Sequence, residues 1–300
     1  MKTRMVPGLR VAFVGHDEQR CSLPEGGAWA HVSFHSLREG WRSALSQASL
    51  RSPDVTFLLL DDSFAPTGPL TSLGVCIGVV GRPPWGPNGR WPLSVWARHG
   101  IDGWVWYEAP PSDAPRVDAI LPTPVNRHGL RLPDFSKQQV VVPQWAAPDA
   151  AALELMNAQR HLALIEPSLS IERQLECLES AGTYVTVVRD ALGRLDPLPL
   201  QAMARGLLVV STSPFPSSWG LEPEDDYLLR PESALPETVN EVRRVPETFH
   251  PVRLRAAQKV AEFFDADFVY QRLVFDLLLS RDAGRVIETP RREVRLRSVR

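Results

Sequence analysis

The sequence predicts an α/β protein of two Rossmann-like domains, each built on a parallel sheet, with helices crossing back at the C-terminus. Strands alternate with helices or loops in the first half, and a second alternation starts after residue 160. Several predicted strands are apolar throughout, as at 207–210, which is typical of strands buried on both faces of a parallel sheet. Such alternation favours a doubly wound sheet in each half.

The composition of the 300 residues restricts the class of protein. With 44% hydrophobic residues the chain can bury a large core, and its formal net charge of −2 argues against a dedicated nucleic-acid binder. Three separated cysteines predict neither a disulfide framework nor a zinc site. No signal peptide is expected, and no apolar run reaches the about 18 residues of a membrane span. We expect a soluble, cytoplasmic protein.

The first expected domain, residues 1–148, begins with an apolar strand at 9–15. A helix is expected at 36–50, where Leu37, Trp41 and Leu45 lie at helical spacing. Further strands are expected at 54–62, 74–81, 101–108, 117–124 and 138–145, and the last of these is expected to close this half.

The second expected domain, residues 149–282, follows a helical joint at 146–160. Strands are expected at 161–168, 183–190, 207–213 and 225–233, and helices at 170–182, 198–206, 234–247, 252–264 and 267–279. Ser170 is a predicted N-cap, and Gly182 is predicted to end the same helix. The final helix is expected to pack on the first half. The arginine-rich tail, 283–300, is expected to be solvated or to dock an acidic partner.

One stretch, "LPLQAMARGLLVVSTSPFP" at 198–216, resembles the donor-site element of the GT-B glycosyltransferases. In that family a Glu precedes Ala-Met-Ala, a Gly ends the helix, and a strand with a small-residue loop follows. The "DDYLLRPES" stretch at 225–233 resembles the segment that comes next. The resemblance implies two facing Rossmann domains, a nucleotide-sugar donor held between them, and no other cofactor. The chain's size is similar to that of the small spore-maturation glycosyltransferase-like group.

The sequence departs from the family pattern at the donor site. The retaining branch has a Glu before Ala-Met-Ala and another eight positions earlier, where this chain has Gln201 and Gly193. Gln can bond a ribose hydroxyl, but without a charge each bond is weaker. The family's Arg and Lys pair for the diphosphate also has no Lys here between Lys137 and Lys259. Asp196 offers a carboxylate at a shifted position.

The donor-binding candidates are therefore Arg189, Arg194 and Gln201, together with the loop of Ser211, Thr212 and Ser213. Arg189 follows a predicted strand, so it is either a phosphate clamp or a surface ion-pair residue. Backbone N–H groups of the loop could contact an anion, although Ser and Thr after a strand often only form a turn.

Two histidines are candidates for the base that takes the acceptor's proton. His16 follows the first strand, where capping is the alternative role, and His99 lies in "ARHG", where a cation at a helix end is the alternative. His31 and His35 have metal-ligand spacing only if they lie on a helix, and "HVSFHS" is better explained as a strand or loop. Asp61 and Asp62 favour turn and cap roles.

Three functions are compatible with these observations to different degrees. The first is a glycosyltransferase that moves a sugar from a nucleotide-sugar donor to an unidentified acceptor. The second is a catalytically weakened relative that serves as a binding subunit or scaffold. A Rossmann oxidoreductase is disfavoured, because no glycine-rich turn opens either half. The Trp-rich stretch at 83–106 is either core or a surface for an acceptor or a protein partner.

Overall fold

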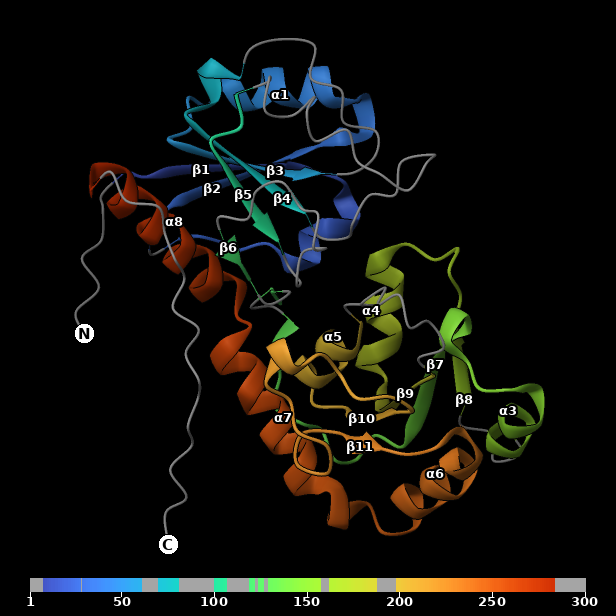
Figure 1. Cartoon of the computed structure of the whole chain (residues 1–300). Helices are drawn as coiled ribbons and strands as arrows, with labels where there is room; N and C mark the ends of the chain where they lie inside the picture. Colours follow the sequence, from blue (N-terminus) through green and yellow to red (C-terminus); the bar gives the residue numbers. More distant parts are fainter. Residues whose placement is uncertain are drawn as a thin grey trace, which may run out of the picture.

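The computed structural model contains two separate parallel sheets (Figure 1). It describes residues 8–27, 29–60, 70–80, 100–106, 119–121, 124–126, 129–157, 162–187 and 198–283. None of the described helices is long and apolar enough to cross a membrane.

The first sheet has six parallel strands in the order β2-β1-β3-β4-β5-β6. Its strands are β1 (Arg10–Gly15), β2 (His31–Ser36), β3 (Val55–Leu60), β4 (Val75–Val80), β5 (Gly103–Trp106) and β6 (Ala119–Ile120). The "HVSFHS" stretch is thus a strand, β2, as its alternation predicts, and it lies at the edge of the sheet. The predicted helix is the 3₁₀ turn η2 (Leu37–Glu39) followed by α1 (Trp41–Ser49).

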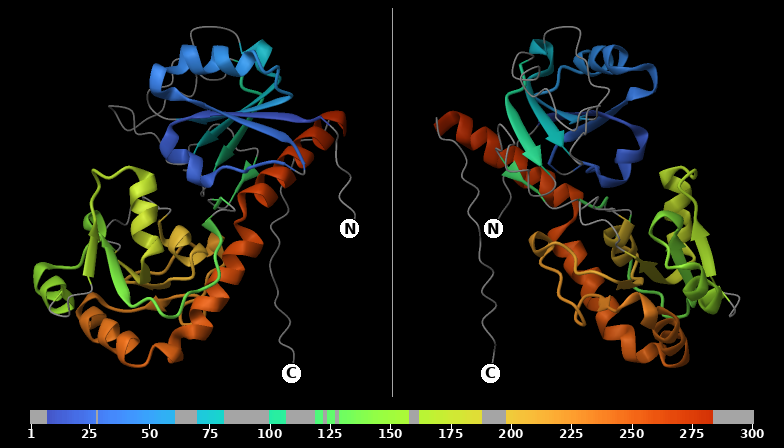
Figure 2. Two further views of the ribbon diagram at one scale, coloured as in Figure 1. Left: turned by 180° about the vertical axis from the view of Figure 1, so that it is seen from behind. Right: turned by 45° about the vertical axis from the view of Figure 1, so that its right-hand side comes forward.

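Both faces of the first sheet are covered, which explains why its central strands are almost wholly apolar, with Thr56 of β3 as a buried exception. Alternate residues point to opposite faces. Val11 and Phe13 of β1 pack with Tyr270 of α8 (Ala266–Ala283). Ala12 and Val14 pack on the face that α1 covers. The final helix therefore packs on the first half, as the sequence predicts, and Figure 2 shows it running along that sheet.

The second sheet has five parallel strands in the order β11-β10-β9-β7-β8. They are β7 (Gln139–Pro143), β8 (Leu162–Ile165), β9 (Ala181–Thr186), β10 (Leu208–Ser211) and β11 (Leu228–Leu229). The assignment of the 138–145 strand to the first half is wrong, because β7 pairs with β8 and β9. The chain has already entered the second half before the predicted joint, which is the helix α3 (Ala150–Asn157).

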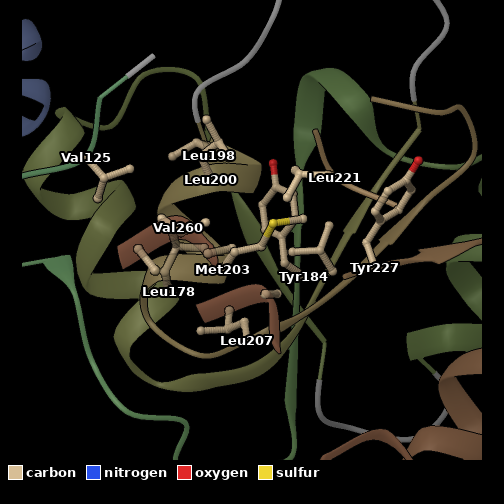
Figure 3. Close-up of a cluster of buried hydrophobic side chains, with 14 of the residues drawn as sticks. Val125, Leu178, Tyr184, Leu198, Leu200, Met203, Leu207, Leu221, Tyr227 and Val260 are labelled. Atoms are coloured by element: carbon tan, nitrogen blue, oxygen red, sulfur yellow. The ribbon is translucent and has the colours of Figure 1, made fainter. Parts of the chain in front are cut away.

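Helices cover the second sheet on both faces as well. One core joins its strands to α4 (Ile171–Glu179), α5 (Leu198–Ala204) and α7 (His250–Phe263). Figure 3 shows the side chains of Tyr184, Met203, Leu207 and Val260 gathered in this core. The opposite core contains Met156 of α3 and residues of α6 (Leu235–Arg244).

The helix α4 begins as predicted but ends differently. Ser170 caps its N-terminus by accepting a hydrogen bond from the backbone N–H of Arg173 at 3.4 Å. Gly182 does not end the helix, since Ser180 is the C-cap and Gly182 lies inside β9. A Cβ at Gly182 would lie 1.9 Å from the carbonyl oxygen of Lys137. The glycine is explained by this close approach of two backbones.

The two halves are joined by two chain passages that lie side by side. Val125 on the outward passage forms an isolated parallel bridge with Asp265, between α7 and α8. The Val125 N–H donates to the carbonyl of Phe264 at 2.7 Å, and the Ala266 N–H donates to the carbonyl of Val125 at 2.9 Å. The Asn126 side chain donates to the carbonyl of Leu23 at 2.7 Å and fixes this passage to the first half.

A buried carboxylate attaches α8 to the first half. Oδ1 of Asp267 accepts from the Gly26 N–H at 2.8 Å and from the Trp29 indole N–H at 2.9 Å, and Oδ2 accepts from the Glu25 N–H at 3.4 Å. These donors lie more than 230 positions away in the sequence, so the side chain connects the start of the chain to its last helix.

We expect Asp267→Ala to lower the free energy of unfolding by about 2–4 kcal/mol, because it leaves the buried Trp29 indole N–H and the partly buried Gly26 N–H without an acceptor. Asp276→Ala on the same helix is the matched control. Asp276 is half-exposed and pairs with Arg272 at 3.8 Å, so its loss should cost less than about 1 kcal/mol. Urea denaturation measures both variants, and equal losses would show that Asp267 does not hold α8 in place.

Candidate functional site

In an open α/β sheet, ligands bind at the carboxyl ends of strands, next to the point where the strand order reverses. In the first sheet this reversal lies between β1 and β3, and in the second it lies between β7 and β9. The turn η1 (Asp17–Ser22), directly after β1, lies against α4, which follows β8. The carboxyl end of β1 therefore faces the second half of the chain.

His16 lies at the carboxyl end of β1 and begins η1. Its backbone N–H donates to Oε1 of Gln19 at 2.9 Å, and its carbonyl accepts from the Gln19 N–H at 3.0 Å. A Cβ at Gly15 would lie within 2.8 Å of Gln19 and Leu59 side-chain atoms, so this turn is tightly packed. The structure gives His16 a capping position at the end of the strand that faces the second half. A role as base stays a prediction.

Gln201 is buried, with 1% of its surface exposed. Its side-chain oxygen accepts from the guanidinium of Arg205 at 2.7 Å, and its backbone carbonyl accepts from the same group at 3.1 Å. Gly129 packs over the pair, since a Cβ there would lie 3.0 Å from Arg205 and 3.3 Å from the Gln201 oxygen. The oxygen expected to bond a donor ribose is already engaged by a cation.

Ser211, Thr212 and Ser213 form a compact loop at the carboxyl end of β10. The Ser211 hydroxyl donates to the Ser213 carbonyl at 2.7 Å and accepts from the Ser213 N–H at 3.3 Å. The Thr212 N–H donates to the carbonyl of Thr186 at the end of β9, at 3.2 Å. These bonds form a turn, which is one of the two roles that the sequence allows for this loop; the other is anion binding. They also hold the loop beside β9, the strand after which Arg189 follows.

The Ala-Met-Ala motif is part of the packing of the second half. Ala202, Met203 and Ala204 are all buried in the core shared by α5 and α7. Figure 3 shows Met203 in this core. Gly206 has a positive φ of 72°, and a Cβ there would lie 2.4 Å from Pro133. The motif lets α5 lie close to its neighbours and sets the position of β10.

Several predicted site residues lie outside the described residues. These are His99, Arg189, Gly193, Arg194, Asp196, Asp61 and Asp62, together with the arginine-rich tail from residue 284 and most of the Trp-rich stretch. Two tryptophans of that stretch, Trp104 and Trp106, are described. Both are 5% exposed and belong to the core between the first sheet and α1, so they form no partner surface.

No three potential metal-ligating side chains meet in the part of the chain that the structure describes. His31 and His35 lie on a strand rather than a helix, so the helical spacing that would suit a metal does not occur.

Sequence reasoning missed two residues of this region. Trp145 follows β7, at the reversal point of the second sheet, and 44% of its surface is exposed. The assignment of its strand to the first half concealed it. Arg205 was missed because its pairing with Gln201 becomes evident only once Gln201 is seen to be buried. The signal available in the sequence was the i, i+4 spacing of the two residues on one predicted helix.

Solved structures share this architecture. HepE of Anabaena, in complex with UDP and glucose, matches with a TM-score of 0.55 and 7% identity, over 90% of this chain and 100% of that one. An alpha-glucosyltransferase in complex with UDP and a mismatched 13-mer DNA matches with a TM-score of 0.56 and 10% identity, over 91% and 100%. AviGT4, a glycosyltransferase involved in avilamycin A biosynthesis, matches with a TM-score of 0.55 and 13% identity, over 92% and 99%.

The chain has the GT-B fold. This confirms the fold class that the sequence predicts, with two Rossmann-like units and a returning C-terminal helix. At such identities the similarity establishes the fold alone. No protein-family model matches the sequence, and no curated protein matches it.

The Gln201–Arg205 pair gives a prediction for stability. Gln201→Leu removes the side-chain acceptor, so we expect it to lower the free energy of unfolding by about 1–3 kcal/mol. Gln201→Glu is the matched control, because it keeps an acceptor that faces the cation of Arg205. We expect its free energy of unfolding to exceed that of Gln201→Leu by about 1 kcal/mol. Urea denaturation measures both, and equal stability of the two variants would contradict a stabilising pair.

Proposed function

We propose that this protein is a glycosyltransferase that moves a sugar from a nucleotide-sugar donor to an acceptor. The observation that carries the proposal is the carboxyl edge of the second sheet. The exposed Trp145 follows β7, which borders the β7–β9 reversal. The compact loop of Ser211 to Ser213 follows β10, which pairs with β9. Three solved structures with the same fold support the proposal. The alpha-glucosyltransferase and AviGT4 are glycosyltransferases, and HepE and the alpha-glucosyltransferase are both in complex with UDP.

In this proposal the second half holds the donor. The loop of Ser211, Thr212 and Ser213 offers backbone and hydroxyl groups to the diphosphate, and Arg189 and Arg194 neutralise its charge. Trp145 stacks on the nucleotide base. His16 or His99 takes the proton of the acceptor hydroxyl, so that the oxygen can attack the anomeric carbon as the nucleoside diphosphate leaves. No cofactor beyond the donor is proposed.

The position of Gln201 bears on how the ribose is held. With its oxygen engaged by Arg205 and its side chain buried, Gln201 acts by positioning α5 and the strand that follows. In the proposed enzyme the ribose is held by other groups at this edge. The finer prediction, membership of the small spore-maturation group, rests on the sequence resemblance and on chain size.

The second candidate is a weakened GT-B protein that serves as a binding subunit or scaffold. The engaged Gln201 and the missing carboxylates favour it, since this protein lacks the charged ribose acceptor that the family resemblance implies. The two candidates differ in one measurable property, because a scaffold has no need to bind a nucleotide.

Calorimetric titration with UDP, GDP, ADP and TDP separates the two candidates. We expect one nucleoside diphosphate to bind more tightly than the others, because stacking and diphosphate contacts act together at a preformed edge. Absence of heat with all four would contradict the donor-site proposal and favour the scaffold.

Trp145→Ala should weaken binding of that nucleotide by about 1–3 kcal/mol, the usual cost of losing an aromatic platform under a base. Trp145→Phe keeps an aromatic ring and is the matched control, expected to retain most of the affinity. If both substitutions leave the affinity unchanged, Trp145 has no contact with the base.

Arg189→Ala should weaken the same binding by about 1.5–3 kcal/mol, as expected for loss of a charged hydrogen bond to the diphosphate. The corresponding nucleoside, which has no phosphates, should bind wild type and variant equally. A loss of affinity for nucleoside and diphosphate alike would show that Arg189 acts through the fold rather than on the phosphates.

A further inference from the structure

A hollow of about 950 Å³ lies along β2, the edge strand of the first sheet. The alternation of β2 explains its polar wall. Val32 and Phe34 pack with the core on the α8 face, so His31, Ser33 and His35 point to the opposite face, on which α1 lies. This polar face distinguishes the edge strand β2 from the central strands, which are buried on both faces.

Two arginines border the same hollow. Arg10 is the partner of His31 in the β1–β2 register, and Arg51 follows α1. Arg10 is already neutralised, since it pairs with Asp54 at 3.7 Å and donates to the carbonyl of Arg51 at 3.4 Å. In the described part of the chain no carboxylate pairs with the side chain of Arg51 or of His31. The hollow therefore has an excess of positive charge and of hydrogen-bond donors.

His35 is the buried member of this wall, with 8% of its surface exposed. Its Nε2 lies 3.1 Å from the hydroxyl of Ser33. Burial, and secondly the charge of Arg51, lower the pKa of His35 below its ordinary value. An anion between Arg51 and His35 would relieve this repulsion and restore the charged form of the imidazole.

We propose that the hollow binds a small ligand that carries a phosphate group. A guanidinium, two imidazoles and a hydroxyl that line one hollow are donors that recognise a phosphate. The volume lies in the range of small-molecule pockets, and the net charge of −2 argues against an extended polyanion. The hollow lies along the outer strand, whereas the donor edge proposed above belongs to the second sheet, so this site does not depend on that function.

Histidine-detected NMR of the full chain tests the proposal, with inorganic phosphate and a hexose phosphate as probes and the unphosphorylated hexose as the uncharged control. We expect both phosphates to shift the imidazole signals of His31 and His35, which are assigned with His31→Gln and His35→Gln. Tighter binding of the hexose phosphate would identify an ester as the ligand, and equal binding would identify the inorganic anion.

Arg51→Gln should weaken the binding by about tenfold or more, because it removes one charge-assisted bond. It should also raise the pKa of His35 in the absence of ligand. Arg42→Gln removes the same charge from an exposed position on α1 that does not border the hollow, and should change neither property. The proposal is overturned if phosphate leaves both histidine signals in place, or if the two arginine variants weaken binding equally.

Discussion

The parallel bridge between Val125 and Asp265 is the contact on which the architecture depends. Each half has its own sheet and its own covering helices, so the halves could in principle take many relative positions. At this bridge the two passages between the halves are joined by two backbone hydrogen bonds. Asp267, two residues further, then anchors α8 to the loop that contains Trp29. The carboxyl end of β1 is thereby held facing α4.

The part of the sequence that most resembles glycosyltransferases contributes mainly to packing. Met203 and its alanine neighbours fill the core between α5 and α7, and Gly206 permits contact with Pro133. Such residues place β10 and the loop after it. A motif of this kind can therefore persist where the charged groups beside it have changed, as Gln201 illustrates. This explains why the sequence predicts the fold better than it predicts the chemistry.

The sequence predicts most strands because a strand buried on both faces is mostly apolar along its whole length, and this pattern is local. It cannot show which sheet a strand joins. The apolar run of β7 fits either sheet, and only its pairing with β8 and β9 decides. The role of Gly182 is equally hidden from the sequence, because a glycine that ends a helix and a glycine that faces the Lys137 carbonyl look alike in sequence. The alternation of β2 does predict its polar face, but Arg51 joins that face only through the fold.

The position of α8 has a consequence for the order in which the protein folds during synthesis. Val11, Phe13, Phe57 and Tyr270 belong to one core, yet Tyr270 leaves the ribosome after every strand of both sheets. Nascent domains generally fold from the N-terminus onward. Here one apolar face of the first domain lacks its covering helix until the second domain has been made. The first domain therefore completes its core only after the second domain has been synthesised. The emerging chain must shield that face, by transient collapse or with a chaperone, from the time β6 is made until α8 is made.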